Sequence, residues 1–119
     1  MDLDTLKRIV EIEYGDVAND SMIHHGKLRL FIVDGAVVDI WLSNKISGRF
    51  AYHWERRLVD GKIFRHDNFP DPRWKELSTF PKHFHNGSQD NVQESKISDD
   101  PESGVREFMD FVRMTIKSG

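Results

Sequence analysis

Residue types that can move protons and bind phosphate are concentrated near the middle of the sequence. Arg65, His66 and Asp67 end one expected strand, and His83 and His85 lie on the next. Histidine has the unperturbed side-chain pKa nearest neutrality, and arginine forms charge-assisted hydrogen bonds to phosphate. In a ribonuclease that needs no metal, one imidazole removes the proton of a 2′-hydroxyl and another group protonates the leaving oxygen, while an arginine holds the phosphate. These five residues are the predicted catalytic group.

Alternative roles for the same residues stay open. Two histidines at i and i+2 of a strand point to one side, so they could bind a metal jointly. The third ligand would be His66, Asp67 or His53, but no spacing rule selects among them, and we predict neither a bound metal nor a cofactor. In the structural alternative, His83 and His85 only hydrogen-bond to neighbouring loops. Arg65 and Asp67 would likewise form an ion pair at the edge of the core.

The middle of the chain also carries the candidate contacts to nucleic acid. It is more basic than the two ends, and aromatic side chains among basic residues can stack on bases. The predicted nucleic-acid-binding residues are Arg56, Arg73, Trp74 and Lys82. Trp74 has an alternative role as a hydrophobic plug over the edge of the core.

Composition limits the class of protein. A chain of 119 residues is expected to form a single domain, residues 1–119, and 38% hydrophobic with 31% charged residues is typical of a globular protein. The net charge of −3 argues against non-specific coating of nucleic acid. The chain has no cysteine and no apolar run near the roughly 20 residues that span a bilayer. We therefore expect a cytoplasmic protein without a membrane partner.

Helical periodicity is found at both ends of the chain. Apolar residues recur at helical spacing between Leu3 and Val10, and again over Val105–Lys117. Residues 16–26 have no period and are predicted to be a loop, with His24 and His25 on the surface.

The segment Lys27–Ser43 is predicted to be a β-hairpin that turns at Asp34-Gly35. A two-residue turn pairs Val33 with Ala36, which makes both faces of the hairpin apolar. One face would carry Leu28, Leu30, Ile32, Val37, Asp39 and Trp41, and the other Phe31, Val33, Val38, Ile40 and Leu42. The second apolar face would need a cover, either a helix or a second copy of the chain in a homodimer.

Residues 49–59 alternate as a third strand, and a two-residue turn at Asp60-Gly61 leads to a fourth. This turn predicts one polar face and one apolar face. The polar face would carry His53, Glu55, Arg57 and His66; the apolar face would include Leu58, with Arg56, Arg65 and Asp67 at its border.

After two prolines and one helical turn, residues 82–85 are predicted to be a short strand with Phe84 in the core. Residues 86–104 are expected to be a loop with a short extended piece at Val92. The predicted fold is α+β: an antiparallel meander sheet of four to five strands with an N-terminal and a C-terminal helix packed on it.

Two short motifs resemble the TumE family of toxins from prokaryotic toxin–antitoxin systems. The matching positions are Arg65, Asp67, Asn68 and Pro70, followed by Phe80, Pro81, His83 and His85. Tyr52, Trp54 and the final helix match more loosely, so that the resemblance covers about the last two-thirds of the chain. The sequence departs from the family pattern directly after Pro70, where relatives usually have one or two histidines and this chain has Asp71-Pro72-Arg73.

The resemblance implies a toxin held inactive by a cognate antitoxin, often one with a DNA-binding helix-turn-helix domain, and RNA cleavage as its activity. We therefore predict a metal-independent endoribonuclease in which Arg65 positions phosphate. In that prediction His83 and His85 supply acid and base, and His66 or Asp67 supports them. Two alternatives are a non-enzymatic module that grips a cellular protein and a small metalloprotein built on His83 and His85.

Overall fold

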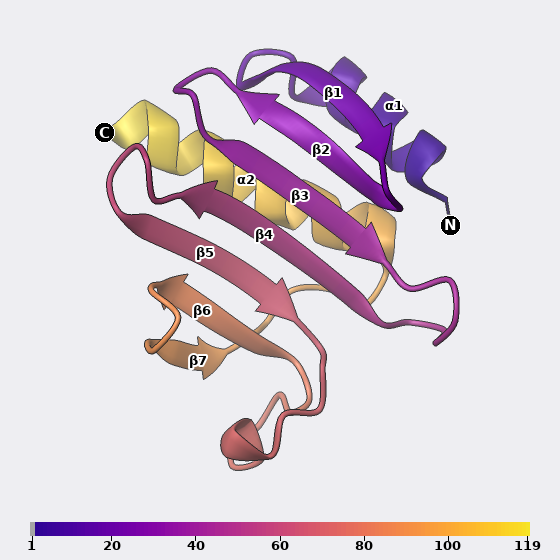
Figure 1. Cartoon of the computed structure of the whole chain (residues 1–119), viewed down its shortest axis with the longest axis vertical. Helices are drawn as coiled ribbons and strands as arrows, with labels where there is room; N and C mark the ends of the chain where they lie inside the picture. Colours follow the sequence, from indigo (N-terminus) through magenta and orange to yellow (C-terminus); the bar gives the residue numbers. More distant parts are fainter. Residues whose placement is uncertain (1) are drawn as a thin grey trace.

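A computed structural model describes residues 2–119 of the chain, which form two α-helices, a short 3-10 helix and seven strands (Figure 1). In chain order they are α1 (Leu3–Glu13), β1 (Ala18–His24), β2 (Lys27–Ile32), β3 (Val37–Leu42), β4 (Phe50–Arg56), β5 (Lys62–Asp67), η1 (Pro72–Trp74), β6 (His83–Gly87), β7 (Val92–Glu94) and α2 (Pro101–Ser118).

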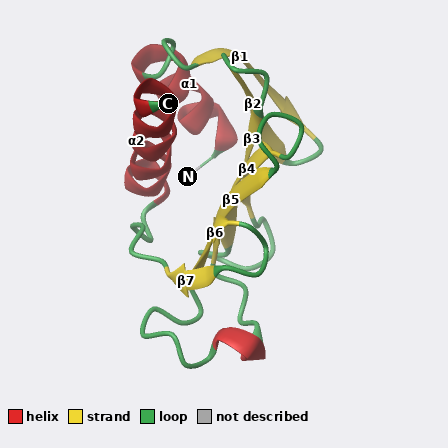
Figure 2. Ribbon diagram, turned by 90° about the vertical axis from the view of Figure 1, so that its left-hand side faces the viewer, coloured by secondary structure: helices red, strands yellow, loops and turns green. Residues whose placement is uncertain are grey.

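All seven strands form one antiparallel sheet, in which each strand pairs with the next in sequence from β1 to β7. Figure 2 shows α1 and α2 on the same face of this sheet, and we call the opposite face the open face. The predicted α+β class, with a meander sheet and a helix from each end of the chain, is confirmed. The sheet is larger than predicted because β1 and β7 also pair.

Both helices begin where side-chain caps satisfy free backbone amides. Asp2 accepts a hydrogen bond from the Thr5 amide at 2.8 Å, and Asp100 accepts one from the Ser103 amide at 3.1 Å. Pro101 fits the first turn, so α2 starts before Val105, where periodicity alone had placed its first residue.

The core lies between the helices and the covered face of the sheet. Side chains of α1 and α2 pack there against those of β2, β3 and β4. Fully buried members are Leu6, Val10, Val17, Leu28, Leu30, Val38, Ile40, Tyr52, Trp54, Val105, Phe108, Met109 and Val112.

The predicted loop at residues 16–26 is wrong, because β1 occupies most of it. β1 is an edge strand with mostly exposed residues, so it lacks the apolar alternation by which a strand is recognised in sequence. His25 and Gly26, with φ of 50° and 75°, form the two-residue turn that pairs His24 with Lys27. Both histidines are exposed, as expected.

The hairpin β2–β3 turns at Asp34-Gly35 as predicted, but its loop has a third residue. Ile32 donates its backbone N–H to the Ala36 carbonyl at 3.0 Å, and Gly35 takes a φ of +94°. The predicted pairing of Val33 with Ala36 is therefore wrong by one residue, which moves every β3 side chain to the opposite face.

This register gives the hairpin only one apolar face. Leu28 now lies opposite Ile40 on the covered face. On the open face Arg29 lies opposite Asp39 and donates two hydrogen bonds to its carboxylate, at 2.8 and 2.9 Å. The second apolar face, on which the expectation of a homodimer depended, is not formed.

The β4–β5 connection is also longer than predicted. Arg56 pairs with Lys62, so the loop spans residues 57–61 and Leu58 is exposed to solvent. The backbone carbonyl of Arg56 accepts hydrogen bonds from three loop amides, which coils the loop instead of turning it in two residues. The shift reverses the faces of β5: Arg65 and Asp67 lie on the open face beside His53, and His66 points toward the helices.

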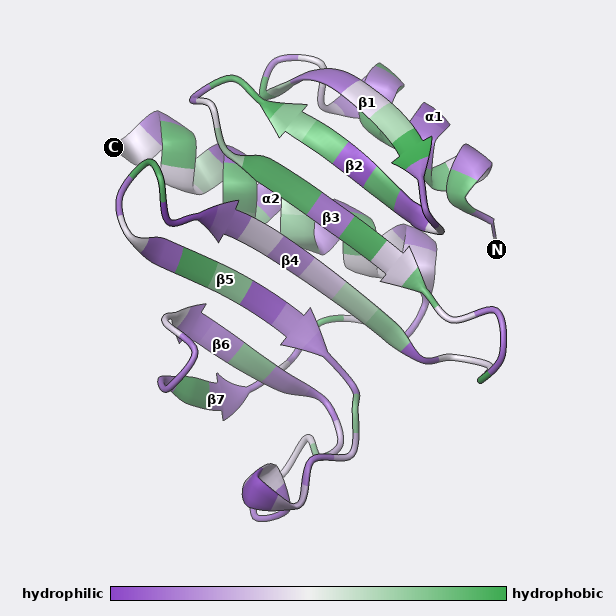
Figure 3. Ribbon diagram, in the orientation of Figure 1, coloured by the Kyte–Doolittle hydropathy of each residue, from purple (hydrophilic) through white to green (hydrophobic). Residues whose placement is uncertain are grey.

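Hydrophilic residues gather where the site lies. Figure 3 shows them at the adjoining ends of β5 and β6. Within residues 2–119, the helices are too short or too polar to cross a membrane.

Arg56 joins two loops at the end of the sheet. Its guanidinium binds Asp34 at 2.5 Å and Asp60 at 2.9 Å, and it lies 4.4 Å from the centre of the Trp54 ring. With 9% of its surface exposed, Arg56 is positioned to stabilise the fold.

We predict that Arg56→Ala lowers the free energy of unfolding by about 2 kcal/mol, because it leaves two partly buried carboxylates without a partner. Urea denaturation measures this change. Arg57→Ala is the matched control: its side chain is 54% exposed, so its effect should stay within about 0.5 kcal/mol. Equal losses in the two variants would contradict the role of Arg56.

Candidate functional site

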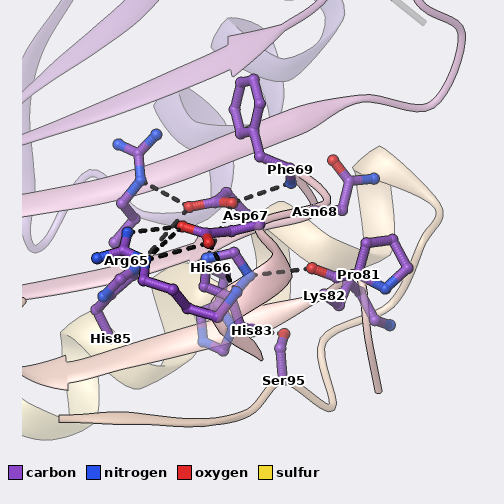
Figure 4. A network of polar contacts seen from close by, with 12 residues as sticks. Arg65, His66, Asp67, Asn68, Phe69, Pro81, Lys82, His83, His85 and Ser95 are labelled. Atoms are coloured by element: carbon purple, nitrogen blue, oxygen red, sulfur yellow. Dashed lines mark hydrogen bonds and ion pairs between the residues drawn. The ribbon is translucent and has the colours of Figure 1, made fainter. Parts of the chain in front are cut away.

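The pairing of β5 with β6 assembles a polar site on the open face of the sheet (Figure 4). Arg65 lies opposite His85, and Asp67 lies opposite His83. Since residues two apart on a strand share a face, all four side chains point to the same side. The sequence predicted these four residues, and the structure brings them together. We call Asp67, His83 and His85 the histidine–aspartate cluster.

Asp67 is the centre of this cluster. One carboxylate oxygen accepts a hydrogen bond from the Phe69 amide at 3.0 Å and lies 3.3 Å from Nε2 of His83. The other accepts from Nε of Arg65 at 2.9 Å and lies 4.0 Å from Nε2 of His85. Asp67 is only 4% exposed, so its hydrogen-bond partners are these neighbours rather than water.

Backbone carbonyls fix the orientation of both imidazoles. Nδ1 of His83 lies 3.0 Å from the Pro81 carbonyl oxygen, and Nδ1 of His85 lies 2.9 Å from that of Gln89. A carbonyl oxygen can only accept, so each Nδ1 must carry a proton. In the neutral ring Nε2 is therefore the nitrogen with the free lone pair, and both Nε2 atoms face Asp67.

Burial favours the neutral form of His85. Loss of hydration lowers its pKa, although the hydrogen bond to the Gln89 carbonyl acts in the opposite direction. Trp74, from η1, borders the pair, with its ring centre 6.2 Å from that of His83 and 6.5 Å from that of His85. The cluster is thus enclosed on one side by the proline-rich connection between β5 and β6.

A cavity of about 300 Å³ lies on the open face next to the cluster. It is lined by Lys27, Asp39, Trp41, Ala51, His53, Arg65 and Phe69. The Trp41 and Phe69 rings stack with their centres 5.5 Å apart, and Arg65 belongs both to the cavity and to the site. The aromatic rings suit this cavity to a flat ligand, and its charged side chains are two cations, Lys27 and Arg65, and one carboxylate, Asp39.

His66, also predicted as catalytic, lies on the other side of the sheet. It stacks on Phe84 with ring centres 4.1 Å apart and lies 2.7 Å from the Ser95 hydroxyl through Nδ1. Burial lowers the pKa of His66 to about 4, so the ring is neutral. The sheet separates His66 from the histidine–aspartate cluster.

The four predicted RNA contacts are divided among different surfaces. Arg73 is exposed, pairs with Asp71 at 2.6 Å and lies over Trp74 at the border of the cluster. Lys82 instead binds the Ile97 carbonyl and, at 3.2 Å, Asp99. Arg56 is held within the ion pairs described above.

Sequence reasoning missed Lys27 and Trp41 as cavity residues, and it considered His53 only as a residue of a polar sheet face and as one of three candidate metal ligands. These residues come from distant strands, and their link to the site depends on the register of four consecutive pairings. Alternation along β4 did reveal that His53 faces away from the core. The sequence did not reveal the length of the β4–β5 loop, and this length determines that Arg65 pairs with His53.

The fold and the site define a small α+β protein in which histidine, aspartate and arginine side chains meet on the open face of a meander sheet. The chain belongs to the TumE family of toxins, since the family model described as Toxin TumE matches residues 3–116. The match extends well beyond the two-thirds of the chain in which the motifs were found. No curated protein and no solved structure matches the chain.

We predict that neutral His85 in the metal-free protein is protonated at Nδ1 and bare at Nε2, because the Gln89 carbonyl can only accept a hydrogen bond and Nδ1 must therefore donate it. Long-range ¹H–¹⁵N spectra of the imidazole nitrogens at about pH 8, above the ordinary histidine pKa, measure the tautomer. Exposed His24 is the internal control. A protonated Nε2 on neutral His85 would contradict the geometry.

Proposed function

We propose that this protein is the toxin of a toxin–antitoxin pair and that it acts by cleaving RNA at the open face of its sheet. The observation that carries the proposal is the convergence of both Nε2 atoms on Asp67, with the Arg65 guanidinium bound to the same carboxylate. Membership of the TumE family supports the role as a toxin, and the arrangement of these side chains supports RNA cleavage as its activity.

Arg65 would hold the scissile phosphate. Its side chain is 29% exposed, whereas that of Asp67 is 5% exposed, so one edge of the guanidinium binds Asp67 and the rest remains accessible. Arginine binds phosphate through several N–H groups in one plane, and a partly buried arginine does so with little competition from water.

In the proposed reaction, Nε2 of His85 accepts the proton of the 2′-hydroxyl as that oxygen attacks phosphorus. The bond from phosphorus to the 5′-oxygen breaks, and this oxygen takes the proton that His83 holds against Asp67. The products are a 2′,3′-cyclic phosphate and a 5′-hydroxyl end. This division of roles needs one protonated and one neutral imidazole. We assign the acid to His83 because its Nε2 lies 3.3 Å from one Asp67 oxygen, whereas Nε2 of His85 lies 4.0 Å from the other.

The neighbouring cavity would bind a nucleotide next to the cleaved bond. Trp41 and Phe69 offer ring surfaces for a base, and Lys27 adds a positive charge. On the other border of the cluster, Trp74 and Arg73 would contact the next part of the strand. Lys82 and Arg56 lie outside this proposed path.

We predict that the double variant His83→Asn, His85→Asn cleaves RNA at least about 100-fold more slowly, because it removes the proposed acid and base together. Incubation of purified protein with total RNA, and analysis of the product ends, measures the effect. Arg65→Gln is a second variant outside the buried pair, and we expect it to lose at least about tenfold.

The matched control is His24→Gln, His25→Gln, which removes two exposed histidines and should cleave at the wild-type rate. Thermal melts establish that each variant is folded. Cleavage that persists unchanged in the His83, His85 double variant, or its absence in wild-type protein, would refute the endoribonuclease and leave the non-enzymatic binding module as the explanation of toxicity.

Membership of a toxin family implies a cognate antitoxin. We propose a DNA-binding helix-turn-helix protein encoded beside the toxin. Co-expression of such a neighbour should restore growth to cells that express this chain, and the two proteins should co-purify, because in this proposal the antitoxin neutralises the toxin by binding it directly. An unrelated helix-turn-helix protein is the control, and equal rescue by it would contradict the assignment.

A further inference from the structure

The histidine–aspartate cluster has a second property besides its proposed acid–base chemistry: its donor atoms are arranged as a coordination shell. One ligand atom from each of Asp67, His83 and His85 can be chosen so that all three lie within 4.8 Å of one another. We propose that Asp67, His83 and His85 bind one divalent first-row transition-metal cation. This property concerns the same side chains as the proposed nuclease, but binding of the ion does not depend on RNA cleavage.

The distances fit such an ion. Zinc bonds to imidazole nitrogen and carboxylate oxygen of about 2.0–2.2 Å place neighbouring ligands of a tetrahedral shell about 3.4 Å apart. The Nε2 atom of His83 already lies 3.3 Å from one Asp67 oxygen. His85 Nε2 lies 4.0 Å from the other oxygen, so this imidazole would have to move about half an ångström closer to match the spacing of a tetrahedral shell.

The proposed ligands are held by hydrogen bonds of the kind that orient side chains in metal sites. Each Nδ1–H donates to a backbone carbonyl, which fixes the tautomer and turns the Nε2 lone pair toward Asp67. The Phe69 amide and Arg65 orient the carboxylate in the same way. Without a cation or a proton between them, the lone pairs of both rings would face the negative carboxylate, which is unfavourable at low exposure.

The donor set also selects the class of ion. Two imidazoles and one carboxylate suit zinc, iron, cobalt, nickel or manganese, whereas magnesium and calcium prefer oxygen ligands alone. The positive charge of Arg65 lowers the affinity for any cation, but Arg65 is the most exposed of the four side chains and its charge is partly screened. Three protein ligands leave coordination positions free for water or for an oxygen of a bound anion.

Metal and proton compete for the same lone pairs. An ion on His83 and His85 would displace the proton of His83 and occupy the proposed base, so the metal-free reaction and metal binding exclude one another at a given moment. A bound ion would hold a water molecule in place of the imidazole base.

The test is a titration of the complete, chelator-treated chain with Zn²⁺ by calorimetry and with Co²⁺ by visible absorption, without RNA. We expect about one ion per chain, a cobalt spectrum of low coordination number and release of protons on binding. Mg²⁺ in excess should not displace Zn²⁺. The variant His83→Asn, His85→Asn should lose at least about tenfold in affinity, and the control His24→Gln, His25→Gln should bind as the wild type does.

A measurement on the wild-type protein avoids any effect of mutation on folding. Paramagnetic Co²⁺ should shift the ring signals of His83 and His85 before those of His24 and His25. Substoichiometric binding, or signals of the exposed pair shifting first, would overturn the metal site. These titrations contain no RNA, so a failure to bind metal would not argue against the nuclease. Conversely, a protein that binds one ion but cleaves no RNA would refute the nuclease and leave the metal site supported.

Discussion

The pairing of β5 with β6 is the constraint on which the site depends. Side chains alternate between the two faces along each strand, so a slip of one residue between the strands would separate Arg65 from His85 and send both histidines toward the helices. Phe84 opposes that slip. It lies between the two histidines in sequence and packs on the covered face against Phe64 and His66, so burial of an aromatic ring fixes the positions of polar groups on the opposite face.

The two faces of the sheet have different roles: the covered face packs against the helices, and the open face carries the polar site. Both helices are on the covered face, where they pack on the main hydrophobic core and Trp54 and Phe108 are buried. The open face can therefore carry a row of charged and aromatic residues without weakening the core. The polar groups of the open face form hydrogen bonds and ion pairs with one another. Arg29 binds Asp39, Arg65 binds Asp67, and backbone carbonyls accept hydrogen bonds from both histidines.

Proton transfer and metal binding are alternative uses of one geometry. A bare imidazole nitrogen close to a carboxylate can accept a proton from a substrate or share a cation with the carboxylate, and the same carbonyl hydrogen bond prepares it for both. This chain has Asp71-Pro72-Arg73 after Pro70 in place of the histidines usual in relatives, and the histidine–aspartate cluster forms without them. Asp71 caps η1 there, and Trp74 closes one side of the cluster without any histidine from that loop.

The sequence by itself determined those features that depend on local pattern. Periodicity located both helices, alternation placed Tyr52 and Trp54 in the core, the His83-x-His85 spacing put both imidazoles on one side, and two motifs identified the family. Edge strand β1 was not predicted, because most of its residues are exposed and apolar and polar residues do not alternate along it.

Only the tertiary structure decided which faces meet. Loop lengths after Ile32 and after Arg56 set the register of the strands that follow, and an odd change in register exchanges the two faces of a strand. His66 therefore lies on the covered face, and Asp67 is the third member of the cluster. A sequence shows the alternation of side chains within each strand, but the partner opposite each residue depends on hydrogen bonds and packing formed between distant segments.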